Sequence, residues 1–250
     1  MQHLYWKQII ACCIALCLSG MVVAQKGTMN QPDHDYEPYW FGMNYGYAFT
    51  YSDYVRGSNF MPGQPTVGEI TSIYHNGNPT FQLGLSGTLR LKKKLLLRAN
   101  PMVFIGAKNI DKFSIRASTG VSEDYLVTPS TILHLPIALK LESDRYDVFN
   151  QSYLMRHYIF GGVKLDYDFA SGAIKYGSSG NTASPNIFKT TNMGYEVGLG
   201  LSFFLRYATI SPEIKFSTGL SDMKKPGTTF FNSLDKLHSN FVSFTIHLEN

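Results

Sequence analysis

Two carboxylates separated by one residue, Asp166 and Asp168, form the pair in this sequence that most resembles a general acid and base. A spacing of two places both side chains on one face of a β-strand, where one could donate a proton and the other accept it. The same spacing also suits two carboxylates that form ion pairs with basic side chains on the inner face of a barrel. We favour this second interpretation.

Two other segments carry side chains of possible chemical use. Asp33, His34 and Asp35 stand in a row within the polar stretch 25–38, and such residues can bind a metal ion. A flexible, solvated lead explains this stretch more simply. The run 161–164, Gly-Gly-Val-Lys, lacks the upstream glycine of a phosphate-binding loop. We therefore predict no catalytic residue, no cofactor and no metal site.

The first 24 residues have the pattern of an export signal. Lys7 is their only charge, residues 9–24 are almost wholly apolar, and Val22 and Ala24 form a small-residue cleavage site. This pattern predicts a secretory signal peptide cleaved after Ala24, and the alternative is a retained membrane anchor. All three cysteines lie inside this segment, so the mature chain could form no disulfide bond.

The composition excludes several classes of protein. Only 16% of the 250 residues are charged, whereas a soluble domain has about 25%. Aromatic residues make up 14%, which is too many for a disordered chain. Without Lys7 the formal charge is +3, from 21 basic and 18 acidic residues. This excess is too small to indicate a nucleic-acid partner.

Large apolar residues alternate with small or polar ones along most of the chain. In residues 41–51 the odd positions hold Phe, Met and Tyr, and the even positions hold Gly, Asn, Ala and Thr. A period of two indicates a β-strand. Most of these segments have the length of a tilted strand that crosses a bilayer, which needs about 9–11 residues. The pattern predicts eight strands, at 41–51, 80–91, 95–105, 133–142, 159–169, 193–203, 208–217 and 242–248.

The predicted connections alternate in length, as they do in outer-membrane barrels. We expect tight turns at 92–94 and 206–207 and an intermediate connection at 143–156. Four long outer loops are expected, at 52–78, 107–130, 170–191 and 221–239. Pro101, Pro136 and Pro212 fall inside predicted strands and could mark bulges.

The fold class predicted is all-β, an eight-stranded antiparallel up-and-down transmembrane β-barrel over residues 39–250. It follows the signal peptide, 1–24, and a flexible periplasmic lead, 25–38. A soluble barrel of lipocalin type would show the same period with its faces exchanged. The non-apolar face is rich in Gly, Ala, Ser and Thr, whereas a surface in water would carry many Lys and Glu. We therefore expect the apolar face to contact outer-membrane lipid.

The inner face of this predicted barrel carries five basic and five acidic residues. Because an eight-stranded barrel has room for little beyond its own side chains, these charges must pair with one another. They predict a salt-bridged plug and no wide pore. The basic residues are Arg90, Arg98, Lys140, Lys164 and Lys215, and the acidic ones are Glu142, Asp166, Asp168, Glu196 and Glu213.

Two other functions stay open at this stage. Some eight-stranded outer-membrane barrels are lipid-modifying enzymes that use a histidine with Ser or Asp at the outer rim. The predicted topology places His134 towards that rim, without an evident partner, and His157 and His247 towards the periplasm. The second alternative is a general barrel for the passage of small solutes.

Three segments resemble the PorT family of type IX secretion proteins. They are Leu133–Lys140 followed by Arg145 and Tyr146, then Tyr158–Ser171, then Ser211–Leu220, and the resemblance spans roughly 39–220. It implies a non-enzymatic outer-membrane barrel, needed for the export of cargo proteins and, in some bacteria, for gliding motility. The implied role is a membrane anchor or scaffold, and the implied partners are other secretion components and exported cargo. One departure is the end of the chain, Leu248-Glu249-Asn250, where many barrels carry an aromatic assembly signal.

Overall fold

The computed structural model describes residues 31–57, 70–77, 79–117, 120–147, 154–169, 175–177, 182–183, 189–223 and 234–250. The predicted signal peptide and its cleavage after Ala24 lie outside these residues. Within them, no helix has the length and hydropathy needed to cross a membrane. The elements are a 3-10 helix η1 (Asp33–Asp35) and the strands β1 (Tyr39–Arg56), β2 (Ile70–Asn76), β3 (Pro79–Lys92), β4 (Leu95–Ala99), β5 (Met102–Ala117), β6 (Gly120–Glu142), β7 (Met155–Asp168), β8 (Lys175–Gly177), β9 (Thr182–Ala183), β10 (Thr191–Phe204), β11 (Thr209–Gly219) and β12 (Leu234–Glu249).

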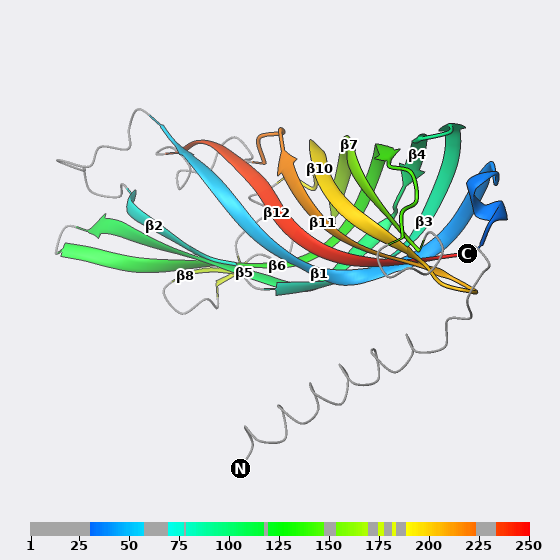
Figure 1. Cartoon of the computed structure of the whole chain (residues 1–250). Helices are drawn as coiled ribbons and strands as arrows, with labels where there is room; N and C mark the ends of the chain where they lie inside the picture. Colours follow the sequence, from blue (N-terminus) through cyan, green and yellow to red (C-terminus); the bar gives the residue numbers. More distant parts are fainter. Residues whose placement is uncertain are drawn as a thin grey trace, which may run out of the picture.

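Eight strand positions close into an antiparallel ring (Figure 1). From β1 the hydrogen-bonded order is β12, β11, β10, β7 and β6, then β4 and β5 together, then β3, which pairs again with β1. β4 and β5 share one position because Asn100 and Pro101 interrupt that strand. Pro136 and Pro212 stay inside β6 and β11 without interrupting them. The predicted eight-stranded up-and-down barrel is confirmed.

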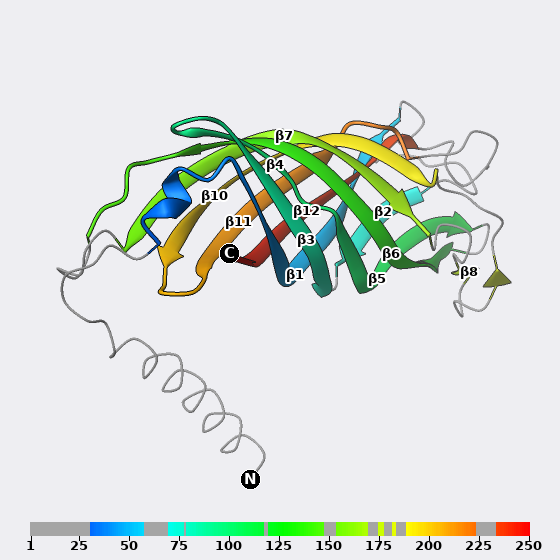
Figure 2. The ribbon, with the colours of Figure 1, turned by 90° about the vertical axis from the view of Figure 1, so that its right-hand side faces the viewer.

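The predicted loop 107–130 is wrong, and the three other predicted long loops contain β2, β8 and β9, and the start of β12. Residues 107–130 form a β-hairpin in which β5 and β6 continue past the ring and pair as far as Ala117 and Gly120. β2 adds to the free side of β5, and β8 pairs with β6, so a small sheet extends from this end (Figure 2). The hairpin could not be recognised from the sequence, because residues 107–130 lack the apolar alternation of the membrane strands. Its backbone groups pair with each other, which requires no apolar face.

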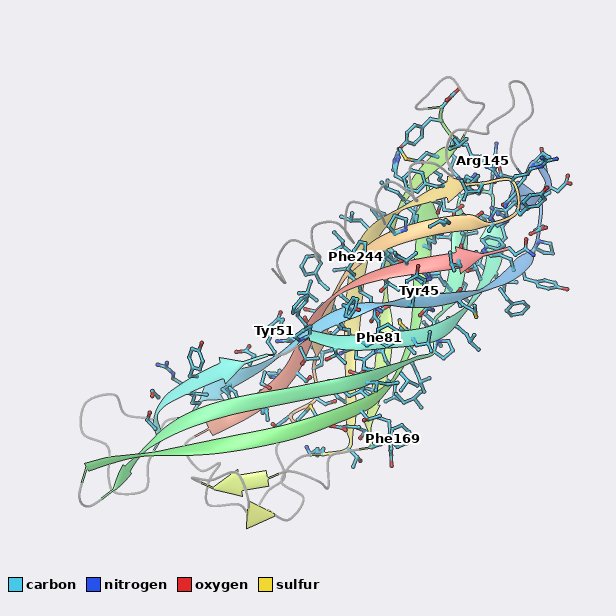
Figure 3. The ribbon with its side chains drawn as sticks, turned by 90° about the horizontal axis from the view of Figure 1, so that it is seen from below. Tyr45, Tyr51, Phe81, Arg145, Phe169 and Phe244 are labelled. Atoms are coloured by element: carbon cyan, nitrogen blue, oxygen red, sulfur yellow. The ribbon has the colours of Figure 1, made fainter. Side chains whose placement is uncertain are left out.

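The two faces of the barrel wall are as predicted. In β7, Val163 and Leu165 are exposed on the outside, whereas Lys164 and Asp166 are buried inside. The labelled Tyr45, Phe81 and Phe244 of β1, β3 and β12 are exposed on the same outer surface (Figure 3). An apolar outer face with a charged interior is the reverse of a soluble barrel. This wall therefore suits lipid outside and paired polar groups inside.

Glycines on the inner face make room for large rings inside the barrel. A Cβ atom at Gly198 would lie 2.4 Å from Cζ of Phe160, and one at Gly200 would lie 2.4 Å from Cζ of Tyr158. Both rings belong to β7 and lean over β10, its neighbour in the ring. The small residues of β10 thus allow aromatic side chains to fill the lumen. These rings then pack against the charged groups described below.

The short turns and η1 lie at one end of the barrel, opposite the extension of β5 and β6 (Figures 1 and 2). The connections from β3 to β4 and from β10 to β11 are only a few residues long. In outer-membrane barrels the short turns face the periplasm and the longer loops face outwards. We therefore call the end with η1 the periplasmic end.

Candidate functional site

A buried ion pair joins opposite sides of the lumen. Nη2 of Arg98, on β4, lies 2.6 Å from Oε2 of Glu213, on β11, and both side chains are only 1% exposed. The Tyr158 hydroxyl donates to the same carboxylate oxygen at 3.0 Å, and Nε2 of His247 lies 3.5 Å from it. The Arg98 guanidinium also lies 4.7 Å from the ring centre of Phe160. This cluster connects β4, β7, β11 and β12 through side chains alone.

A second cluster surrounds His134 on β6. Its Nδ1 lies 2.6 Å from Oδ1 of Asp166, and its Nε2 lies 3.1 Å from Oε2 of Glu196. Lys164 pairs with Asp166 at 2.7 Å, and Lys215 pairs with Glu196 at 3.3 Å. Nζ of Lys215 also lies 3.3 Å from the same Nε2, so the imidazole stands among two carboxylates and an ammonium group. Asp166 is thus a member of an ion-pair cluster, which is the interpretation favoured from the sequence.

The expectation that His134 has no partner is therefore wrong. It has two carboxylate partners, which the sequence did not reveal because they come from β7 and β10. Its position towards the outer end of β6 is as expected, but the side chain is 0% exposed and lies inside the lumen. A lipid headgroup could not reach the imidazole in this position. His157, by contrast, points outwards, and His247 points into the lumen as expected.

An apolar layer covers the His134 cluster. The ring of Phe104 stacks on the His134 imidazole at 5.3 Å between centroids, and Phe241 contacts it edge-on at 5.2 Å. The Lys164 ammonium lies 4.3 Å from the ring centre of Phe241. These aromatic groups shield the charges below them from water. The full layer consists of Ala48, Met102, Phe104, Ile132 and Phe241.

The chain of ion pairs continues to the periplasmic end. Lys140 lies 3.0 Å from Glu142, and Nη1 of Arg156 donates to the other oxygen of Glu142 at 2.5 Å. Nη2 of Arg156 then donates to Oδ1 of Asp35 at 2.8 Å. Nε of Arg145 lies 3.0 Å from Oδ2 of the same carboxylate, so two arginines hold Asp35. Figure 3 shows Arg145 at the end of the barrel where η1 lies.

The described part of the lead, residues 31–38, is docked in this periplasmic mouth and is not a solvated tail. His34 is buried, with its ring 4.6 Å from that of Trp40 and 5.5 Å from that of Phe204. Arg90 donates to the carbonyl oxygens of His34 and Glu37, both at 3.1 Å. The expectation of a flexible lead is wrong for these residues. The folded barrel brings together arginines that are far apart in the sequence, so the sequence did not show that they could bind the lead.

The predicted charges are thus distributed among three places. Arg90 lies at the mouth and binds the lead, so its expected pairing with an inner carboxylate is not what the structure shows. Asp168 is buried at the outer end of β7. The other eight predicted residues form the inner pairs: Arg98 with Glu213, Lys140 with Glu142, Lys164 with Asp166, and Lys215 with Glu196.

Sequence reasoning missed Asp35, Arg145, Arg156 and Tyr158 as members of this network. Arg156 and Tyr158 occupy inward positions of β7, which begins earlier than predicted. Extending the period of two backwards from Phe160 would have found both. Arg145 follows the end of β6, where no periodic pattern applies. Among the described residues, no three His, Cys, Asp or Glu side chains are grouped so that they could hold a metal ion.

Docking of the lead should depend on pH through His34. Burial lowers the pKa of its imidazole, and the Glu37 carboxylate 3.4 Å from Nδ1 opposes this shift. The undocked lead therefore takes up a proton before the docked one does, so docking should weaken as the pH falls through about 6.5. Glu249 and Arg145 also act on this imidazole. Trp40, beside the ring, provides a fluorescence signal for docking.

The measurement is a titration of Trp40 fluorescence between pH 8 and pH 5 in the folded protein. The His34→Gln variant is the matched control, because it keeps a polar side chain and removes the titrating group. We expect a transition in the natural protein that is absent from the variant. An identical transition in both proteins would assign the pH dependence to other groups.

The sequence matches a family of outer-membrane barrels. A family model described as "Outer membrane protein beta-barrel domain" matches residues 35–225. No curated protein matches the sequence. The crystal structure of OprG from Pseudomonas aeruginosa is 14% identical over 84% of this chain and 94% of its own, with a TM-score of 0.40. The outer membrane protease OmpT from Escherichia coli is 10% identical over 90% of this chain and 98% of its own, with a TM-score of 0.42. The outer membrane protein W from E. coli is 18% identical over 84% and 97%, with a TM-score of 0.34.

Proposed function

Because the chain belongs to the outer membrane protein beta-barrel domain family, we propose that it is a non-enzymatic membrane anchor of the type IX protein secretion system. Its task in this proposal is to hold other secretion components at the outer membrane while cargo proteins are exported. The segments that resemble the PorT family support this assignment. They include Tyr158–Ser171 and Ser211–Leu220, which carry much of the inner charge network.

The filled lumen is the observation that carries the proposal. Ion pairs follow one another from His134 to Asp35, with an apolar layer beyond His134 and the lead docked at the other end. Such an interior favours a rigid body over a passage for solutes, because buried charges are costly to separate. A barrel of this kind offers its ends and its outer surface to partners.

The alternative of a lipid-modifying enzyme has little support. It needs a histidine that a lipid can approach, and the imidazole of His134 lies between two carboxylates and two aromatic rings. The alternative of a solute barrel would require the four inner ion pairs to separate. Neither alternative accounts for the three segments that resemble secretion proteins.

Deletion of the gene in its host tests the proposal. We expect type IX cargo proteins to disappear from the medium and to accumulate in the periplasm, and the natural gene supplied in trans should restore their export. The abundance of an unrelated outer-membrane protein serves as the control for general membrane assembly. Normal export of cargo after deletion would reject the assignment. A large steady conductance of the purified protein in planar bilayers would favour the solute barrel.

A further inference from the structure

The hydrogen bonds between the lead and the barrel all run in one direction. In every hydrogen bond described between residues 31–38 and the barrel, the barrel donates and the lead accepts. Arg90, Arg145 and Arg156 supply most of the donors. The acceptors are backbone carbonyls, the Asp35 carboxylate and the side-chain oxygen of Gln31. The mouth is therefore a cationic cradle for an acceptor-rich segment of chain.

Little of this recognition is specific to the sequence of the lead. Arg145 donates to the carbonyl oxygen of Gln31 at 3.0 Å, and Arg90 donates to two further carbonyls. Carbonyl oxygens are present in any polypeptide. The side chains of the lead that contact the barrel in the described residues are the Asp35 carboxylate, the His34 ring and the Gln31 amide, whereas Tyr36 is 86% exposed. Another segment with one carboxylate and one flat ring could make most of the same contacts.

The cradle also contains hydrogen-bond donors that have no partner in the lead. Nε1 of Trp40 and Nε of Arg156 are buried and have no hydrogen-bond partner among the described residues. Both side chains are more than nine-tenths buried and both line the mouth. A segment with more carboxylate oxygens than the lead has would satisfy them. These two unused groups are donors, as are the groups that hold Asp35, so they favour an anionic occupant, whereas Oε1 of the neighbouring Glu249 is an unused acceptor.

We propose that the periplasmic mouth is a docking site for an acidic segment of a periplasmic protein, which residues 31–38 occupy in its absence. The lead is tethered beside the site, so its effective concentration is of the order of millimolar and a partner must outcompete it. Additional carboxylates on the partner would supply that advantage through charge-assisted hydrogen bonds. This inference deepens the proposed function by naming the contact site of the anchor.

Binding of a labelled peptide to the full-length folded protein tests the site. The probe is the peptide of residues 31–38, and the receptors are the natural chain and its Asp35→Asn variant. Loss of the Asp35 carboxylate weakens the tethered lead, so the variant chain should bind the natural peptide about tenfold more tightly than the natural chain does. An Asp35→Asn peptide should bind about tenfold more weakly than the natural peptide.

Asp33→Asn supplies the matched control in both the chain and the peptide, because the Asp33 side chain is exposed and makes no described contact with the barrel. This change should leave both affinities unaltered. The receptor variant Arg145→Gln should lose peptide binding, and heat-modifiable migration on gels verifies that it still folds. Absence of binding to the Asp35→Asn chain, or equal binding of the natural and Asp35→Asn peptides, would overturn the proposal. The readout is binding and not export, so this inference and the secretion role can fail separately.

Discussion

Replacement of Glu213 by Ala should lower the free energy of unfolding of the barrel by about 3–5 kcal/mol, because it leaves the buried Arg98 charge without its partner. The two side chains are separated by 115 positions in the sequence and by 2.6 Å in the structure. Glu213 also accepts the Tyr158 hydroxyl, so the same change leaves a buried donor without its acceptor. Equilibrium unfolding in guanidinium, with the protein in lipid vesicles, measures the loss.

Two variants control this experiment. Asp144→Ala removes an ion pair of the same length, Lys94 to Asp144 at 2.6 Å, on the exposed periplasmic side. Its loss should cost no more than about 1 kcal/mol, since water screens exposed pairs. The double variant Arg98→Met with Glu213→Leu removes both charges and should be more stable than Glu213→Ala. Equal losses for Glu213→Ala and Asp144→Ala would show that the inner pair does not stabilise the barrel.

Replacement of Ile137 by Arg should cost about 2–4 kcal/mol, because a charge on the outer face near the middle of the membrane has no polar partner. Ile137 stands in the centre of the membrane-facing part of β6, between Ala99 and Val163 on the neighbouring strands, and is 54% exposed. The same unfolding measurement applies, and the folded fraction on mild gels gives a second readout.

Leu141→Arg is the matched variant for this prediction. Leu141 lies on the same strand and face and is 50% exposed, but it is next to the periplasmic end of β6. There the long side chain can reach the headgroups, so the expected cost is only about 0–1 kcal/mol. A similar cost at both positions would mean that the outer face of β6 does not cross a bilayer at the predicted depth.

Ion pairs between residues of the same strand could be predicted from the sequence. Lys140 and Glu142, like Lys164 and Asp166, stand two positions apart on the inner face, and both pairs form. The separation of two positions alone brings such side chains to the same side of the wall. The partners of Arg98 and His134 were out of reach, because they stand on strands whose distance across the lumen depends on closure of the ring.

The sequence by itself determined the eight strands of the ring, though not their full lengths, together with their inner and outer faces and the closed antiparallel order. These properties are local, since alternation of side-chain direction follows from the backbone of each strand, and a membrane admits no open edge. Only the tertiary structure decided which charges meet between different strands and segments. Asp35 binds Arg145 and Arg156, which stand 110 and 121 positions away, because ring closure brings the start of the chain to the ends of β6 and β7. Register and curvature set such contacts, and no short stretch of sequence encodes either of them.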